Sequence, residues 1–305
     1  MVVDLRMYCK SNVDFGFLVF MSLQKEIYNN FILSIRDSLK SRNIIDRVEY
    51  AGSRYKGTHV DASDFDNLFI KRDQTIIAEL SPYPSYFYLT IPGVSKVNRG
   101  DRLTTFKTEI QRALRDVGAS GFAQITNSYG PTVVVNYRKH GLSFSVDMVY
   151  GLEIGDKIFV AKPSHEASSS DTNLWYKTFV LLEKDRMRTI DFNNGIGKMV
   201  IRRLKKLKDV EPALKVINSY AFEQALMYLK DDHHDALFWR ENNMKDILKT
   251  ILLFMENALR KGNLPAYFDK HNNAIGGLTT EQKIQLANRF KRLAANPDIV
   301  LKKTD

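Results

Sequence analysis

Between residues 17 and 42 apolar residues recur every three or four positions, a spacing that predicts an amphipathic helix with one buried face. Short runs rich in β-branched and aromatic residues follow, and glycine or proline turn signals close several of them. These runs predict strands at residues 45–51, 67–71, 86–91, 132–137 and 142–150, with a helix at 103–117. A short polar segment separates the last two strands, so we expect an antiparallel hairpin.

The second half of the chain follows a different pattern. After a serine-rich stretch at residues 164–171, helical spacing predicts helices at 175–190, 197–208, 211–230, 243–261 and 279–295. Thr279 and Gln282 fit a capping box at the start of the last one. The sequence therefore predicts an α+β protein with a mixed core lobe at residues 1–172 and a helical lobe at residues 173–305. Two lobes favour a ligand cleft between them.

Composition narrows the classes of protein. The 305 residues contain 45 Lys and Arg against 35 Asp and Glu, and this excess of ten positive charges favours a polyanionic partner. A single cysteine, Cys9, supports neither an intrachain disulfide nor a multi-cysteine zinc site, which favours a reducing compartment. The longest apolar runs are far shorter than the roughly 20 residues that span a bilayer. We therefore expect a cytoplasmic protein without zinc and without a membrane partner.

Three acidic residues and one turn carry the candidate chemistry. Asp64 and Asp66 stand two positions apart, so on a strand both would project from the same face. Asp147 interrupts a strand of alternating apolar residues, where a carboxylate needs a metal ion or a cation. Gly52 and Ser53 end a strand, where free N–H groups and a hydroxyl can hold phosphate. Each feature alone is more often structural, but together they match a two-metal nucleotidyltransferase using Mg²⁺ or Mn²⁺.

A family resemblance rests on these motifs. The run from Gly52 to Val60, the Asp-Phe-Asp-Asn-Leu-Phe run at 64–69 and the Phe-Ser-Val-Asp-Met run at 144–148 resemble cyclic GMP-AMP synthase-like receptors. The likeness continues through residues 175–184 and 218–226. It implies a bilobal nucleotidyltransferase fold, in which a long spine helix lies beside a mixed sheet and a helical lobe follows. It also implies synthesis of a cyclic dinucleotide from ATP and GTP.

The resemblance also implies residue roles. Asp64, Asp66 and Asp147 would bind the two catalytic Mg²⁺ or Mn²⁺ ions. Nucleotide contacts would come from Gly52, Ser53, Thr178, Glu183, Lys198, Ser219 and Tyr220. The Tyr220 ring would stack on a nucleobase, and Lys198 and Ser219 would contact phosphate. Without the resemblance, Tyr220 would more often be helix packing, Lys198 a solvated charge and Glu183 an acid on a helix surface.

The chain departs from the human-type enzyme at several positions. Tyr176 stands in place of an arginine and Val149 in place of a threonine, which leaves base choice and linkage open. The His-Cys-Cys-Cys zinc thumb is missing, and His233 and His234 fit a loop pair better than a metal site. Because the thumb lies at the DNA surface of the DNA-sensing enzyme, its loss favours a different ligand.

Positive charge is concentrated in two of the predicted helices. On a helical wheel Arg202, Lys205 and Lys206 share the face of Lys198, opposite an apolar face. If this helix and the first helix lie side by side, as the resemblance implies, they form a groove that suits double-stranded RNA. The predicted nucleic-acid contacts are Lys25, Arg36, Lys40, Arg42, Arg202, Arg203, Lys205, Lys206 and Lys208. A solvated charge run is the simpler alternative.

We therefore expect a nucleotidyltransferase of innate immune, antiviral signalling that double-stranded RNA activates. Its product would be a cyclic GMP-AMP-like dinucleotide. Two alternatives stay open: a linear product, as in oligoadenylate synthase, and a catalytically silent scaffold. Assembly as a dimer on the nucleic acid also stays open.

Overall fold

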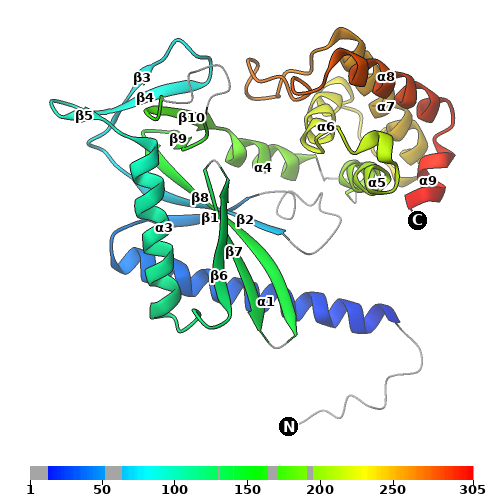
Figure 1. The fold of residues 1–305 in the computed structure, drawn as a ribbon. Helices are drawn as coiled ribbons and strands as arrows, with labels where there is room; N and C mark the ends of the chain where they lie inside the picture. The colour runs from blue at the N-terminus through cyan, green and yellow to red at the C-terminus, as the bar shows by residue number, and fades with distance from the viewer. Residues whose placement is uncertain are drawn as a thin grey trace.

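The computed structural model describes residues 13–51, 64–129, 131–139, 141–163, 171–190 and 195–304. Figure 1 shows a twisted sheet with two long helices packed against it and a group of further helices at one end. The predicted α+β class with a mixed sheet is confirmed. Among the described residues, no helix combines the length and the apolar character needed to cross a bilayer.

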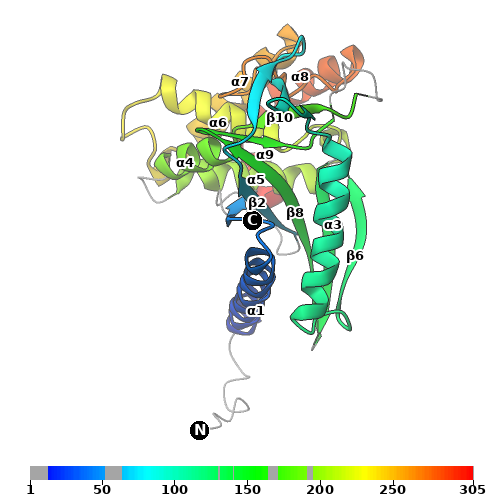
Figure 2. The ribbon, with the colours of Figure 1, turned by 90° about the vertical axis from the view of Figure 1, so that its left-hand side faces the viewer.

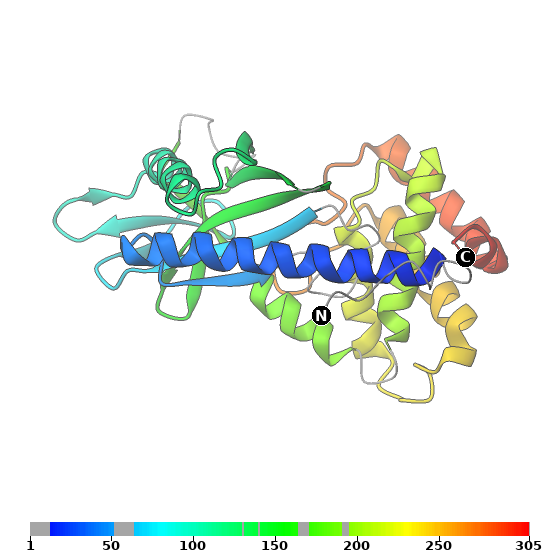
Figure 3. The ribbon, with the colours of Figure 1, turned by 90° about the horizontal axis from the view of Figure 1, so that it is seen from below.

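The first helix is the one that the opening apolar pattern predicts. It is α1 (Val13–Ser41), and Phe31, Ile35 and Leu39 on its predicted face are buried. Seen from below in Figure 3, α1 runs along the sheet and continues past it toward the other helices. The helix ends at a turn in which Asn43 adopts a left-handed backbone with φ of 58°.

Ten strands form one sheet in the part of the chain that the structure describes. The strands are β1 (Arg47–Ala51), β2 (Asp64–Arg72), β3 (Ile77–Leu80), β4 (Tyr86–Ile91), β5 (Ser95–Lys96), β6 (Ala123–Tyr129), β7 (Thr132–Lys139), β8 (Leu142–Ile154), β9 (Lys157–Val160) and β10 (Leu174–Thr178). The main path runs β1-β2-β8-β9-β10-β4-β3, with β6 and β7 joined to β8 through β7 and β5 paired with β4. The predicted hairpin of β7 and β8 is confirmed as antiparallel, whereas β2 and β8 pair in parallel.

The two faces of the sheet have different neighbours. On one face, the Phe65 ring stacks on Tyr28 of α1 with 3.7 Å between ring centroids, and Phe69 packs on Phe106 of α3 (Arg99–Asp116). Figure 2 shows α3 running beside β6. On the other face, Leu68 and its neighbours pack against α4 (Val180–Thr189). Because successive side chains of a strand alternate, Asp66 belongs to this second face with Leu68.

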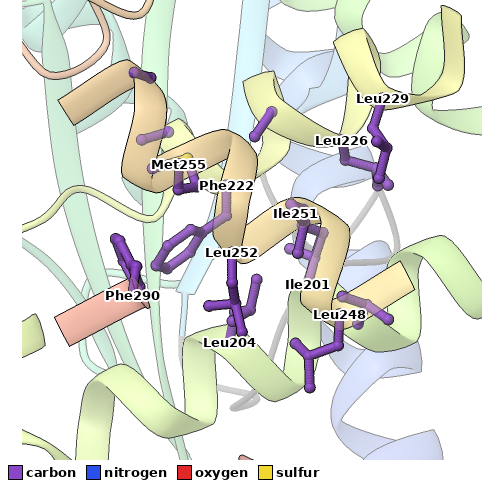
Figure 4. Packing of buried hydrophobic residues seen from close by; sticks show 14 of the residues in the cluster. Ile201, Leu204, Phe222, Leu226, Leu229, Leu248, Ile251, Leu252, Met255 and Phe290 are labelled. Atoms are coloured by element: carbon purple, nitrogen blue, oxygen red, sulfur yellow. The ribbon is translucent and has the colours of Figure 1, made fainter. Parts of the chain in front are cut away.

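The remaining helices form a second hydrophobic core. They are α5 (Ile196–Val210), α6 (Tyr220–Asp232), α7 (Met244–Lys261), α8 (Thr280–Ala295) and α9 (Asp298–Thr304), with short 3₁₀ turns at Pro212–Leu214 and Glu241–Asn243. Figure 4 shows Phe222 of α6 packed near Leu252 of α7 and Phe290 of α8, with Leu226 and Leu229 of α6 at the other end of the same cluster. The Thr279–Gln282 capping box is confirmed, since each side chain accepts from the other residue's backbone N–H.

Two helix predictions were wrong. Residues 175–178 are not helical: they belong to β10, which lies between β9 and β4, and the buried Trp175 indole N–H donates to the carbonyl of Val97 at 2.9 Å. Residues 211–230 are not one helix, because Pro212 starts a separate 3₁₀ turn and the next helix begins at Tyr220. The division into lobes at residues 172 and 173 stays a prediction, although β10 joins the sheet from beyond that point.

Candidate functional site

Strand pairing brings the predicted acidic residues together. In the parallel pair of β2 and β8, Asp66 lies directly opposite Asp147, and Asp64 lies opposite Ser145. Neighbouring strands are about 4.8 Å apart, and directly paired residues project to the same face. The Asp66 and Asp147 side chains are therefore neighbours on one face of the sheet. Both side chains are half-buried. The Asp64 side chain is outside the described side chains, and Gly52 and Ser53 are outside the described residues.

The donor set at this place suits a hard divalent cation. Carboxylate oxygens are the ligands that Mg²⁺ and Mn²⁺ prefer, and the strand register places Asp66 beside Asp147, with Asp64 two residues before Asp66 on β2. Among the described side chains no group of three His, Cys, Asp or Glu residues converges. The predicted third ligand, Asp64, falls outside that search. The acids therefore fit a metal site by chemistry and register.

A cavity of about 450 Å³ opens on the same face of the sheet. It lies between the ends of β9 and β10, α4, the start of α6 and the loop at residues 272–274, and its volume is typical of a small-molecule site. Three of the predicted nucleotide contacts line it: Thr178, Glu183 and Tyr220. The fold thus brings together residues that are more than forty positions apart in the chain.

Glu183 and Tyr220 are joined within this cavity. The Tyr220 hydroxyl donates to Glu183 Oε1 at 2.6 Å, and the Gln224 amide donates to the same oxygen at 3.4 Å. Glu183 is only 6% exposed, so the alternative of an acid on a helix surface is wrong. Burial, together with the nearby Glu183 carboxylate, raises the pKa of Tyr220 above its ordinary value. The phenol therefore keeps its proton and holds the ring in a fixed orientation.

A second hydrogen-bonded pair supports another part of the cavity wall, which Tyr176 lines. The Tyr176 hydroxyl donates to Asp269 Oδ2 at 2.9 Å, and the Ser85 hydroxyl donates to the other oxygen of the same carboxylate. Burial raises the pKa of Tyr176, with a further contribution from Asp269. The Lys162 ammonium lies 4.7 Å from the Tyr176 ring centroid, and burial lowers its pKa. This wall joins the sheet to the loop after α7.

Sequence reasoning missed most of this second wall. Tyr176 was noted only as a departure from the resembled family, and Lys162, Asp269, Asn272 and Asn273 were not predicted. Asp269 and the two asparagines lie in an irregular loop. Such a loop has no periodic pattern from which the direction of a side chain could be predicted. The helical spacing assigned to residues 175–178 also hid the fact that Tyr176 and Thr178 project from one face of a strand.

The acids and the cavity lie on the same face, at different heights along the sheet. Gly151 of β8 pairs with Val160, which lines the cavity, and Asp147 stands four residues earlier on β8. This separation corresponds to about 13 Å along the strand. Val149 lies between them and packs against the apolar patch under α4. A ligand of nucleotide length could therefore contact both places.

Lys198 and Ser219 are placed differently from the three cavity residues. Lys198 lies on α5 and is 8% exposed, so the alternative of a solvated charge is wrong. Ser219 is half-buried and directly precedes α6, next to Tyr220. Neither residue lines the cavity. Their contact with phosphate stays a prediction.

The predicted basic ridge is partly used for internal contacts. Lys205 is buried, and its ammonium lies 2.8 Å from Glu223 Oε1, so its place on an exposed ridge was predicted wrongly. Arg42 was also expected to be available, but its guanidinium is ion-paired with Glu109 at 2.8 Å and with Asp116. Both side chains therefore tie helices together. They are not available to a nucleic acid in this arrangement.

Other basic residues of α5 contact the last helix. Arg203 donates to Thr304 Oγ1 at 3.0 Å, and Lys206 donates to the Thr304 carbonyl at 3.2 Å. Arg202 and Lys208 are half-buried. The apolar face of α5 is buried as predicted, including Val200, Ile201, Leu204 and Leu207.

The basic residues of α1 do not join those of α5. Lys25 and Lys40 are exposed, and Arg36 is half-buried and ion-paired with Asp37 at 2.7 Å. Figure 1 shows α5 well apart from α1, so the expected packing of these two helices side by side is not present. A continuous groove formed by the two helices was therefore predicted wrongly.

Residues 197–292 match the family model of the Mab-21 protein HhH/H2TH-like domain. The match begins in α5, ends in α8 and includes Lys198, Ser219 and Tyr220.

Curated proteins add weaker similarities. The Mitochondrial dynamics protein MID49 of Xenopus laevis is 28% identical over 138 residues, which cover 45% of this chain and 29% of that protein. The Mitochondrial dynamics protein MID51 of Danio rerio is 23% identical over 144 residues, or 47% of this chain and 30% of that protein. A Cyclic GMP-AMP synthase-like receptor of Microplitis demolitor is 26% identical over 184 residues, or 56% of this chain and 34% of that protein. The chain thus spans about a third of the length of these relatives. The matches show a similarity to the Mab-21 HhH/H2TH-like domain in the helical part of the chain and to cyclic GMP-AMP synthase-like receptors.

Proposed function

We propose that this protein is a metal-dependent nucleotidyltransferase that acts on nucleoside triphosphates. The observation that carries the proposal is the parallel register of β2 and β8, which sets Asp66 opposite Asp147 on the face that also holds the Tyr220 cavity. Two neighbouring carboxylates on a half-buried sheet face repel each other, and a divalent cation bound between them would relieve that repulsion.

Each group of residues has a distinct task in this proposal. Asp64, Asp66 and Asp147 would hold Mg²⁺ or Mn²⁺, which lowers the pKa of an attacking hydroxyl and stabilises the leaving pyrophosphate. The Tyr220 ring presents an aromatic face for a nucleobase, and its hydrogen bond to Glu183 fixes that face. Lys162 supplies a positive charge at the cavity. Gly52 and Ser53 would bind the triphosphate, and Lys198 and Ser219 would contact phosphate.

The product and the activator are further parts of the proposal. A cyclic dinucleotide made from ATP and GTP is supported by the similarity to cyclic GMP-AMP synthase-like receptors. Activation by double-stranded RNA is supported by the net positive charge and by the exposed Lys25 and Lys40 on α1. Arg42 and Lys205 no longer support it, because both are ion-paired within the protein. A role in cytoplasmic antiviral signalling would follow from these two activities.

The test uses the full chain with radiolabelled ATP and GTP, Mg²⁺ or Mn²⁺, and long duplex RNA. Wild-type protein should form a dinucleotide, and Asp66→Asn and Asp147→Asn should abolish product while the proteins stay folded. Asp156→Asn is the matched control, because Asp156 is an exposed acid in the turn after β8. Resistance of the product to phosphatase would separate a cyclic product from a linear one. Equal product from wild type and Asp66→Asn would refute the proposal.

A second candidate is a nucleotide-binding scaffold without transferase activity. It is favoured by the similarity to two mitochondrial dynamics proteins. The cavity could hold a nucleotide without the acids, because its walls come from other strands and helices. In this case ATP analogues would raise the melting temperature, Tyr220→Ala would remove the shift, and no dinucleotide would form under any condition.

A further inference from the structure

A second cavity lies at the opposite end of the parallel strands. It has a volume of about 110 Å³ and is formed where the turn after α1, the end of β2, the first half of α3 and the middle of β8 meet. We propose that this cavity is an oxyanion site that binds a phosphate group. Arg102 and Tyr150 would be its principal donors.

The Tyr150 hydroxyl is a hydrogen-bond donor at this cavity. The residue is only 5% exposed, and it lines the cavity from β8. Its hydroxyl makes no hydrogen bond with a residue that the structure describes. The oxygen is also not fully enclosed by protein atoms, so it is open to the cavity. Burial raises the pKa of Tyr150 to about 12, so the phenol stays protonated and can donate a hydrogen bond at neutral pH.

Arg102 supplies the charge. It projects from α3 into the same cavity, and no ion pair or hydrogen bond joins its guanidinium to another described residue. Guanidinium groups are the usual partners of phosphate, because their planar fork donates two parallel hydrogen bonds. An arginine held next to a buried hydroxyl is thus a ready donor set for an oxyanion.

The other polar groups at the cavity contact one another in part. Lys71 donates to Asn43 Oδ1 at 2.7 Å and is ion-paired with Asp46 at 3.4 Å, and these contacts hold the ammonium at the cavity. Asp73 also lines the cavity, but one of its carboxylate oxygens accepts both the N–H and the hydroxyl of Thr75. Of the two cationic side chains that line the cavity, Lys71 is balanced by Asp46, whereas the Arg102 guanidinium has no ion pair among the described residues. Arg102 and the Tyr150 hydroxyl are therefore the two donors that the cavity offers to a ligand made of acceptors.

The size of the cavity is consistent with one phosphate group. Its volume corresponds to roughly three or four water molecules at about 30 Å³ each, or to a group of a few heavy atoms. Lys71 and Asp73 also line a larger hollow of about 610 Å³, which Arg47, Arg72 and Gln74 help to form. The phosphate could therefore be a free ion or the end of a larger molecule that lies in this hollow.

This site is independent of the proposed transferase site. Asp66 and Asp73 are seven residues apart on and just after β2, which corresponds to about 23 Å. Arg102 and Tyr150 belong to the side of the sheet that α1 and α3 cover. Failure of one proposal would therefore leave the other standing.

The test is a titration of the full chain with inorganic phosphate and, separately, with glycerol 3-phosphate, which carries no nucleobase, followed by phosphorus NMR line broadening. Arg102→Gln should weaken binding at least tenfold, and Tyr150→Phe, which keeps the ring packing, should weaken it several-fold. Arg115→Gln on the exposed part of α3 is the matched control and should bind as wild type does.

The outcomes separate the sources of the phosphate and the two sites. Binding of both probes indicates a free phosphate site, and binding of glycerol 3-phosphate alone indicates a larger phosphorylated ligand. Asp66→Asn should leave both titrations unchanged. The proposal is overturned if neither probe binds, or if Arg102→Gln binds as tightly as Arg115→Gln.

Discussion

The buried ion pair of Lys205 and Glu223 offers a sharp test of how the helices are held together. Lys205 of α5 is 8% exposed and Glu223 of α6 is 4% exposed, and 2.8 Å separate Nζ from Oε1. Lys205→Met removes the ammonium from the buried carboxylate, a change that typically costs about 3–5 kcal/mol. Because folded proteins are stable by only about 5–15 kcal/mol, the loss should be large in a urea titration followed by circular dichroism.

Two controls make this prediction specific. The double variant Lys205→Met, Glu223→Leu should recover most of the loss, because both charges leave the apolar interior together. Lys206→Met should cost about 1 kcal/mol at most, since Lys206 is exposed and gives up one hydrogen bond to a backbone carbonyl. The reasoning is refuted if Lys205→Met unfolds at the same urea concentration as wild type but binds duplex RNA more weakly, because Lys205 would then be a surface contact.

Three further predictions concern pH, packing and the cavity wall. The pKa of Glu153 is lowered to about 2 by hydrogen bonds from arginine, so its stabilising effect should be complete above pH 4.5 and lost as the pH falls toward 2. Acid titration of Glu153→Gln should lack this component, which is about 3 kcal/mol at most. Gly197→Ala should destabilise the fold by about 1–3 kcal/mol in thermal unfolding, because the added methyl would lie 3.1 Å from Ile190 Cγ2; a gain in stability would contradict this. Asp269→Asn should weaken ATP binding several-fold in calorimetry by loosening Tyr176, and an unchanged affinity would show that this wall does not hold the ligand.

Periodic elements could be predicted well from the sequence. The stripe of α1 and the alternation in β7 and β8 depend on side chains close together in the chain, so their pattern survives without knowledge of the fold. The 3.6-residue pattern failed at residues 175–178, where pairing with β4 and β9 overrides the local tendency. Short strands such as β5 and β9 carry too few residues for any pattern to show.

The candidate site was predictable in part for the same reason. Asp64 and Asp66 share a face because they stand two positions apart, which any strand would ensure. That Asp66 lies beside Asp147 depends on the register in which β2 and β8 pair. The sequences of the two strands do not specify this register by themselves. The helical wheel correctly placed the apolar face of α5, but it could not show that Glu223 lies against Lys205.

The sequence by itself therefore determined the helices with strong apolar stripes, the main hairpin and the types of residue that carry the chemistry. Only the tertiary structure decided which of those residues meet. Asp269 reaches Tyr176 from a loop 93 positions away, and Arg42 reaches Glu109 from 67 positions away. Such contacts depend on how whole elements pack, and the free energy of that packing is spread over buried surface that no local window of the chain contains.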